Sequence, residues 1–347
     1  MVRIGKYTIG SGQPCFLIAE AGVNHNGSLD TARRLVELAR RAGANAVKFQ
    51  TFKADRLATT AAPKAAYQER TTDTDESQHE MLRRLELSAD AHRSLAEYCA
   101  SLGILFMSTP FDEESADFLA DLGVPAFKIP SGEINNLPLL AHVASKGKPL
   151  ILSTGMAWLG EVERAVSTVW EAGNLDVVLL HCVSSYPAAP ADVNLRAMET
   201  MSKAFGVPVG FSDHTLGIDV ALAAVALGAS VVEKHFTIDR GLPGPDHHAS
   251  LSPDDLEALV WGVRNVEAAL GDGRKVPVAG ERDTAVVVRK SLVIARDVPA
   301  GTRLTDQDIA FKRPGTGLSP AMKPCVVGRT TRVDIAAGTL VALEMLA

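Results

Sequence analysis

Short apolar runs alternate with amphipathic stretches along most of the chain. Eight runs of four or five mainly apolar or β-branched residues have the length and composition of buried strands. They cover residues 16–20, 46–50, 104–108, 126–129, 150–154, 177–181, 207–211 and 231–234. Helical patterns lie between them, most clearly at residues 29–41, 91–102, 113–122, 159–172 and 218–227. This alternation predicts a parallel α/β fold, a (β/α)8 TIM barrel, because parallel strands need helical crossovers.

The pattern changes after a predicted helix that ends near Leu270. Residues 271–285 begin with a Gly-Asp-Gly segment and are expected to form a linker. Residues 286–347 contain short strand-like pieces broken by glycine and proline, which is typical of a compact, mainly β domain. The sequence therefore predicts a catalytic barrel over residues 1–270, a linker and a small second domain. The 347 residues leave room for both domains, since a TIM barrel takes about 250.

One predicted loop is longer than the connections of most barrels. Residues 51–87 follow the second strand and are rich in Thr, Asp, Glu and Lys, whereas βα loops usually have about two to six residues. Two interpretations are open for this insertion. It is either a solvated excursion with a short helix of its own or a segment that covers a substrate.

Composition narrows the class of protein. The chain is 46% hydrophobic, yet no apolar run approaches the roughly 18 residues that span a bilayer, and no signal-peptide pattern follows Met1. We therefore expect a cytoplasmic protein with no membrane partner. The four cysteines lack CxxC spacing, which argues against a zinc knot or a disulfide framework.

The net charge of −6 is unevenly distributed. Residues 286–347 hold nine Lys or Arg against five Asp or Glu, which leaves 26 against 36 in the rest of the chain. The positive residues are dispersed, so no nucleic-acid partner is expected. A basic second domain is suited to docking on an acidic barrel or to attracting an anionic ligand.

Two histidines follow consecutive predicted strands. His214 comes after the seventh strand and His235 after the eighth, and the carboxyl ends of barrel strands meet at one face. Two imidazoles with water or a substrate oxygen would form an open site for a divalent metal acting as a Lewis acid. A single histidine is more often structural, but the adjacent placement of these two favours metal binding.

Charged residues end several other predicted strands. Lys48 and Lys128 stand in apolar runs, where a cation needs a partner. That partner is either an anionic ligand or one of the carboxylates Glu20, Glu133 and Glu233, which are also candidates for proton transfer or for holding sugar hydroxyls. Hydroxyls after strands four to six suit phosphate or carboxylate oxygens. A metal, a small anion and a hydroxylated partner are therefore expected together.

Many separate motifs, in the same order, resemble the sialic acid synthase family. They are Glu20-Ala-Gly-Val-Asn-His-Asn-Gly27, Lys48-Phe-Gln50, Ser108-Thr-Pro110, Lys128-Ile-Pro-Ser-Gly-Glu133, Gly210-Phe-Ser-Asp-His214, Glu233-Lys-His-Phe-Thr237 and Gly244-Pro-Asp246. The segments Arg289-Lys-Ser-Leu292 and Lys312-Arg-Pro-Gly-Thr-Gly317 resemble the antifreeze-like (SAF) domain that ends these synthases. The resemblance covers essentially the whole chain.

The resemblance implies a role for each group of residues. The phosphoenolpyruvate ligands would be Lys48, Thr109, Lys128, Ser131, Ser184 and Ser212. The sugar would meet Gln50, Tyr186, Asp246 and Arg313, with Glu20, Glu133 and Glu233 as the catalytic candidates. His214 and His235 would hold the metal, for which Mn²⁺ is expected and Mg²⁺ or Co²⁺ are alternatives. The family also implies a domain-swapped homodimer, in which Arg313 meets the sugar in the partner subunit's barrel.

The implied reaction joins phosphoenolpyruvate, an N-acetylhexosamine and water to give a nonulosonic acid and phosphate. We expect N-acetylmannosamine as the acceptor and N-acetylneuraminate as the product. The alternative is a diacetamido-trideoxyhexose, which gives legionaminate or a relative, and Ser184 stands where some N-acetylneuraminate synthases have asparagine. Two further readings are a barrel aldolase acting on a phosphorylated sugar, against which the SAF tail counts, and a carbohydrate-binding protein without turnover.

Overall fold

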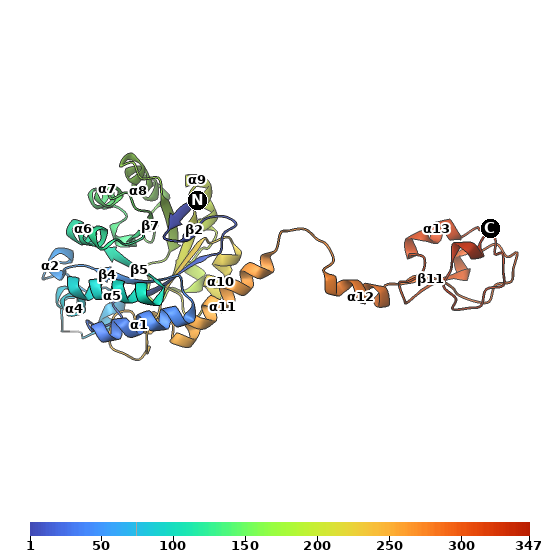
Figure 1. Cartoon of the computed structure of the whole chain (residues 1–347), viewed down its shortest axis with the longest axis horizontal. Coiled ribbons are helices and arrows are strands. Elements are labelled where there is room, and N and C mark those ends of the chain that lie inside the picture. Colours follow the sequence, from blue (N-terminus) through green and yellow to red (C-terminus); the bar gives the residue numbers. More distant parts are fainter. Residues whose placement is uncertain (74) are drawn as a thin grey trace. The chain divides into compact units, whose positions relative to one another are not determined.

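A computed structural model describes residues 1–73 and 75–347, and the chain divides into two compact units, Met1–Gly271 and Asp272–Ala347. The first unit contains eight parallel strands in the order β5-β4-β3-β10-β9-β8-β7-β6. The two end strands, β5 and β6, contact each other, so the sheet is a nearly closed barrel of the TIM type (Figure 1). The strands are β3 Phe16–Gly22, β4 Ala46–Thr51, β5 Leu105–Pro110, β6 Phe127–Ile129, β7 Leu150–Ser153, β8 Val177–Cys182, β9 Val209–Asp213 and β10 Val231–His235. The predicted α/β barrel is confirmed.

Helices cover the outside of this barrel (Figure 1). They are α1 Leu29–Ala42, α5 Ala89–Leu102, α6 Glu113–Leu122, α7 Leu137–Ala144, α8 Leu159–Glu171, α9 Ala197–Phe205, α10 Asp219–Ala226 and α11 Pro253–Leu270. Several begin at a side-chain cap, as at Ser28, Ser88 and Asp112, and end at a left-handed glycine such as Gly43. The insertion folds into α2 Ala54–Leu57, α3 Ala66–Thr71 and α4 Gln78–Leu85. None of the helices in the described ranges is long and apolar enough to cross a membrane.

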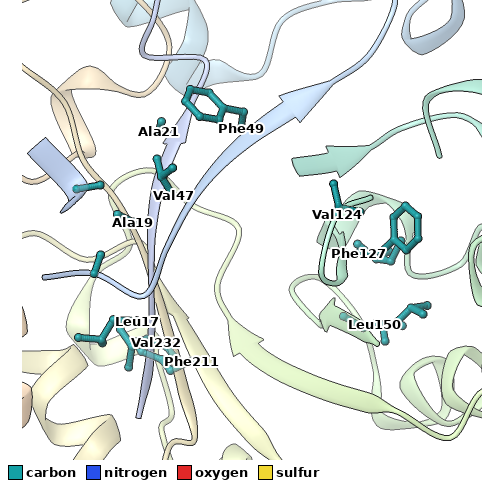
Figure 2. Packing of buried hydrophobic residues seen from close by; sticks show 14 of the residues in the cluster. Leu17, Ala19, Ala21, Val47, Phe49, Val124, Phe127, Leu150, Phe211 and Val232 are labelled. Carbon is teal, nitrogen blue, oxygen red and sulfur yellow. The ribbon is translucent and has the colours of Figure 1, made fainter. Parts of the chain in front are cut away.

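Alternate residues of each strand serve two different cores. Residues that point outward pack against the helices, as Figure 2 shows for Leu17, Val47, Phe211 and Val232. Residues of the opposite parity fill the barrel interior, among them Phe16, Ile18, Ala46, Met107, Ala126, Ile151, Val178, Leu180 and Val231. Because side chains alternate along a strand, the side of each polar residue follows from its position relative to these apolar neighbours.

A short hairpin at the start of the chain completes the interior core. Strands β1 Val2–Ile4 and β2 Tyr7–Ile9 pair antiparallel. Val2, Ile4 and Ile9 are buried in the same cluster as the inward residues of the barrel. The hairpin therefore closes the amino-terminal end of the barrel with apolar side chains. The sequence pattern did not predict it, because three-residue strands carry too short a period to recognise.

The second unit has a core of its own. Strands β11 Ser291–Ile294 and β12 Ile309–Lys312 pair antiparallel, and a short helix, α13 Lys323–Val326, follows them. Its buried residues include Leu292, Ile294, Val298, Leu304, Val326 and Val341. Helix α12, Ala279–Val288, occupies much of the segment predicted as a linker. The second unit also contains isolated antiparallel β-bridges, such as that between Val298 and Ile335. These bridges and the two short strands agree with the mainly β character predicted for residues 286–347.

Candidate active site

Five of the polar residues predicted for the barrel mouth point to the same side of their strands, toward the barrel interior. Glu20, Lys48, Thr109, Lys128 and Glu233 each come two positions after an apolar residue of the interior core. They therefore point into the barrel, one layer above its apolar filling, at the carboxyl ends of the strands. All five are buried. The structure thus brings side chains from five different strands into one chamber.

Lys48 is held by three groups from neighbouring strands. Its Nζ lies 2.8 Å from Glu20 Oε1 and 3.8 Å from Glu233 Oε2, and it donates a hydrogen bond of 3.0 Å to Thr109 Oγ1. Burial alone would lower the pKa of Lys48, but the two carboxylates outweigh it and raise the pKa above its ordinary value. Lys48 is therefore a fixed cation at neutral pH.

Lys128 stands across the same chamber. Its Nζ donates to Ser153 Oγ at 2.7 Å and lies 3.5 Å from Glu233 Oε1, which also accepts from Ser212 Oγ at 3.2 Å. Burial lowers the pKa of Lys128, and Lys48 nearby acts in the same direction, whereas Glu233 opposes them. Glu233 bridges the two lysines, and their charges lower its pKa despite burial. The prediction that these lysines pair with carboxylates holds for Glu20 and Glu233.

Two carboxylate oxygens in this chamber accept no hydrogen bond from the described residues. Glu20 Oε2 and Glu233 Oε2 are buried without a hydrogen bond in the part of the chain that the structure describes. Burial raises the pKa of Glu20 to about 7, against the opposing field of Lys48. An unpaired buried oxygen is costly unless a ligand satisfies it. These atoms point to a polar ligand that donates protons or hydrogen bonds to them.

Hydroxyl groups form a second part of the chamber beside Lys128. Ser131 Oγ accepts from the Gly155 N–H at 3.0 Å and lies 3.1 Å from Cys182 Sγ. A Cβ atom on Gly155 would overlap Ser184 Oγ and come within 2.8 Å of Ser131 Oγ, so only glycine fits there. Serine hydroxyls grouped in this way are hydrogen-bond donors of the type that binds phosphate or carboxylate oxygens.

His214 and His235 face each other at the rim. Their ring centroids are 5.6 Å apart. His214 Nδ1 donates to the Val183 carbonyl at 2.7 Å, which leaves Nε2 with its lone pair free, and His235 Nδ1 has no hydrogen-bond partner among the described residues. Burial lowers the pKa of His214 to about 4 and that of His235 well below its ordinary value. Both rings are therefore neutral at pH 7, the form that coordinates metals.

This donor set fits a divalent ion that completes its shell from outside the protein. The two neutral imidazoles lie with ring centroids 5.6 Å apart, and the negative charge of Glu233 is close enough to act on His214. No group of three or more His, Cys, Asp or Glu side chains placed to hold a metal occurs in residues 1–73 and 75–347. The remaining ligands would be water or substrate oxygens, which is the arrangement of an open, catalytic metal site.

Three predicted sugar-binding residues gather around the histidines. The Tyr186 ring lies 4.2 Å from the His214 ring and 5.9 Å from the His235 ring. Asp246 is buried, and its Oδ2 lies 3.9 Å from His235 Nδ1. Burial raises the pKa of Asp246 to about 6. Gln50 approaches from β4, since its Nε2 would be 3.4 Å from a Cβ placed on Gly22.

Two predicted residues are not brought into this chamber by the described contacts. Glu133 lies in a turn after β6 and accepts a hydrogen bond of 2.7 Å from Asn136 Nδ2. No ion pair joins Glu133 to Lys48 or Lys128 in the described ranges of the chain. Arg313 belongs to the second unit, where its Nε donates to the Val288 carbonyl and its side chain is exposed.

Other residues of the site were not assigned a role from the sequence. Cys182 points inward beside Ser131, which its parity relative to Leu180 could have shown. Tyr67, in helix α3 of the insertion, stacks on Tyr186 with ring centroids 4.9 Å apart. No sequence period marks Tyr67, because a six-residue helix is too short to show one.

Fold and chamber together define a TIM-type barrel with buried lysines, carboxylates and histidines at the carboxyl ends of its strands. Comparison with known proteins is consistent with that class. Residues 35–275 match the NeuB family and residues 289–347 match the SAF domain. The chain therefore belongs to the NeuB family and ends in a SAF domain, as the motifs had indicated.

Three relatives illustrate its similarity. The N,N'-diacetyllegionaminic acid synthase of Legionella pneumophila is 50% identical over 96% of this chain and 95% of its own length. The N,N'-diacetyllegionaminic acid synthase of Campylobacter jejuni is 49% identical over 87% of this chain and 91% of its own. The crystal structure of N-acetylneuraminic acid synthetase from Leptospira borgpetersenii, in complex with citrate, has a TM-score of 0.72 and 37% identity, covering 82% of this chain and 94% of that one.

Proposed function

We propose that this protein condenses phosphoenolpyruvate with a diacetamido-trideoxyhexose to form N,N'-diacetyllegionaminic acid and phosphate. The observation that carries the choice of acceptor is the 50% identity to a synthase of that acid along nearly the whole of both chains. The expectation of N-acetylmannosamine as acceptor is thereby displaced by its alternative. The similarity to an N-acetylneuraminic acid synthetase is lower, at 37%.

The two lysines are suited to bind the enol phosphate. Phosphoenolpyruvate carries a carboxylate and a phosphate on one three-carbon unit, and their repulsion has to be offset by fixed cations. Lys48 and Lys128 are already desolvated and share Glu233 between them. The hydroxyls of Ser131 and Ser184, which lie close to Gly155, offer hydrogen-bond donors for the anion. A preorganised site of this kind needs little rearrangement when the anion arrives.

His214 and His235 would hold a divalent ion, for which Mn²⁺ is our proposal and Mg²⁺ or Co²⁺ are alternatives. Such an ion supplies Lewis-acid polarisation of the acceptor's aldehyde when bound. The two imidazole rings are close enough to hold one ion together, with centroids 5.6 Å apart. Alanine at either position should abolish bound metal measured by elemental analysis. Full occupancy in both single variants would refute this assignment.

The proposed reaction forms one carbon–carbon bond and breaks one carbon–oxygen bond. C3 of phosphoenolpyruvate attacks the aldehyde carbon of the open-chain sugar, and the aldehyde π bond opens to an alkoxide that takes up a proton. The attack uses the enol double bond and leaves cationic character at C2 of phosphoenolpyruvate. Water adds to C2, and cleavage of the C2–O bond releases phosphate with its bridging oxygen. Glu20 is suited to take the proton from that water, because its pKa is raised to about 7 and its Oε2 is unpaired.

Isotope labelling tests the bond that breaks. Phosphoenolpyruvate carrying heavy oxygen in the C–O–P bridge should give labelled phosphate. Retention of the label in the sugar acid would show P–O cleavage and rule out this route.

An acceptor panel tests the function itself. The full-length protein is assayed with phosphoenolpyruvate and N-acetylated hexosamines, including N-acetylmannosamine and the diacetamido-trideoxyhexose, and phosphate release is followed. The proposed function predicts the highest kcat/KM for the diacetamido sugar and a product of the corresponding mass. Phosphate release that needs no sugar, or sugar binding without turnover, would contradict it.

The assembly that we propose is a domain-swapped homodimer in which Arg313 meets the sugar bound by the partner subunit. Arg313 is exposed in its own unit, so its guanidinium is available. Mixing an Arg313→Ala chain with a His214→Ala chain makes heterodimers that hold one complete site. Recovery of activity on mixing two inactive homodimers is the expected result, and no recovery with proven subunit exchange would exclude the swap.

A further inference from the structure

A continuous series of aromatic rings leads from the insertion to the paired histidines. Tyr67 in α3 packs against Tyr186 with ring centroids 4.9 Å apart and an interplanar angle of 30°. Tyr186 in turn lies 4.2 Å from His214. Through Tyr67 the insertion supplies one wall of the space in front of the histidines.

Helix α3 is fastened on both of its sides. Lys64, just before it, is buried and donates to Thr72 Oγ1 at 2.9 Å and to the Asp73 carbonyl, with Glu76 at 3.6 Å. On the barrel side, the Thr71 carbonyl accepts a hydrogen bond of 3.3 Å from the Gly244 N–H. Gly244 is in the loop that also carries Asp246. The position of Tyr67 is therefore set by the barrel as well as by its own short helix.

The wall that Tyr67 presents is apolar in character. Burial raises the pKa of Tyr67 above its ordinary value, and the charge of Asp246 acts in the same direction. Its hydroxyl accepts only a long hydrogen bond of 3.4 Å from Gln68 Nε2 among the described contacts. Aromatic faces favour contact with methyl groups and planar amides over hydroxyl groups, which lose water without gaining a partner.

We infer that Tyr67 is a specificity-determining residue, whose ring recognises the distal acetamido and deoxygenated part of the acceptor. The inference rests on the proposed function, in which the aldehyde carbon of the sugar is held at the histidines. Tyr67 lies one ring further from the histidines than Tyr186. In this proposal the far end of the six-carbon chain lies beside it. A diacetamido-trideoxyhexose carries an acetamido group and a deoxygenated carbon there, where N-acetylmannosamine carries hydroxyl groups.

The test compares both acceptors in the full-length wild type and in Tyr67→Ala, Tyr67→Leu and Tyr67→Phe. Loss of the ring should raise KM for the diacetamido sugar by about 10-fold or more, the usual range for removing an apolar contact in a substrate pocket. The kcat/KM for N-acetylmannosamine should change less than about threefold, and Tyr67→Phe should keep the wild-type preference. KM for phosphoenolpyruvate should stay constant, because Tyr67 does not contact either lysine in the described structure.

Tyr98→Ala is the matched control, since Tyr98 is half-buried in α5 at the barrel surface, where its hydroxyl donates to Glu37 and its ring lies next to Arg33. It should leave the acceptor preference unchanged. Equal loss for both acceptors in the folded Ala and Leu variants would overturn the inference and leave the proposed function standing. Failure of the wild type to use the diacetamido sugar would overturn both. A thermal unfolding curve for each variant identifies any that fails to fold. If Tyr67→Ala does not fold, the acceptor preferences of Tyr67→Leu and Tyr67→Phe provide the test.

Discussion

Replacing Lys234 should show how strongly a buried ion pair supports the two rim histidines. Lys234 and Asp213 immediately precede His235 and His214, but they point to the outside of the barrel, away from the chamber. Lys234 Nζ lies 2.6 Å from Asp213 Oδ2 and donates to the Thr215 carbonyl at 2.8 Å. Asp213 Oδ1 accepts from both the N–H and the hydroxyl of Thr215. The pair therefore joins β9 to β10 directly behind the proposed metal ligands.

The expected cost follows from burial. Both side chains are almost fully buried, with exposed fractions of 2% and 0%. Lys234→Met leaves the Asp213 carboxylate without its countercharge, which costs about 3–5 kcal/mol when such a pair is broken. At about 2–4 °C per kcal/mol for a domain of this size, the melting temperature of the barrel should fall by roughly 6–20 °C. The double variant Lys234→Met with Asp213→Asn removes the orphaned charge and should recover part of that loss.

Tryptophan fluorescence during thermal and denaturant unfolding is the assay, because Trp158, Trp170 and Trp261 all belong to the first unit. Lys203→Met is the control, since it breaks an exposed i,i+4 pair with Glu199 worth about 0.3–0.5 kcal/mol. The reasoning is refuted if Lys234→Met costs no more than this control. It is equally refuted if the double variant is as unstable as the single one.

Three other outcomes are expected. Gly155→Ala should raise KM for phosphoenolpyruvate about 10-fold or more, because the added Cβ overlaps Ser184 Oγ. Gly160→Ala is the control, because a Cβ on Gly160 meets no atom within 4 Å, and its KM should not change. Equal KM values in the two variants would show that the serine group is not part of the anion site. Burial lowers the pKa of His92 to about 4, so His92 takes up a proton at higher pH in the unfolded chain than in the folded one, and the free energy of unfolding falls as the pH drops below about 6.5. In denaturant titrations, His92→Asn should reduce the fall in unfolding free energy between pH 6.5 and 5 by about 2 kcal/mol. The same pH dependence in the variant and the wild type would contradict this. Mn²⁺ at 100 times its Kd should stabilise the wild type by about 2.7 kcal/mol in the same titrations and should not stabilise His214→Ala; equal stabilisation would place the ion elsewhere.

Most of the barrel could be predicted because its strands are buried on both faces. Near-continuous apolar runs such as residues 177–181 leave little doubt about a parallel strand, and a polar residue at the end of such a run is conspicuous. The alternation of side chains then separates Glu233 and His235, which face the chamber, from Lys234, which does not. The same rule places Asp213, the residue before His214, on the outside of the barrel.

The remaining features depend on contacts between segments distant in sequence. Glu133 follows a strand in the sequence, as the carboxylates of the chamber do. The chain turns after Pro130, however, and the Glu133 carboxylate accepts a hydrogen bond from Asn136. Tyr67 lies at the site because its ring packs against Tyr186 and because its helix is hydrogen-bonded to Gly244. The N-terminal hairpin likewise acquires its position from the barrel interior that it completes. Local pattern carries no signal for such long-range packing.

The apolar plug formed by β1, β2 and the inward residues beneath Lys48 and Lys128 has a kinetic consequence. With the lower end sealed, reactants and products share a single opening at the rim. The enol phosphate proposed to lie between the lysines is then the more deeply bound of the two substrates. A sugar bound against Tyr186 would block the entry of phosphoenolpyruvate from the rim. Binding should accordingly follow a compulsory sequence, phosphoenolpyruvate first and the acceptor second.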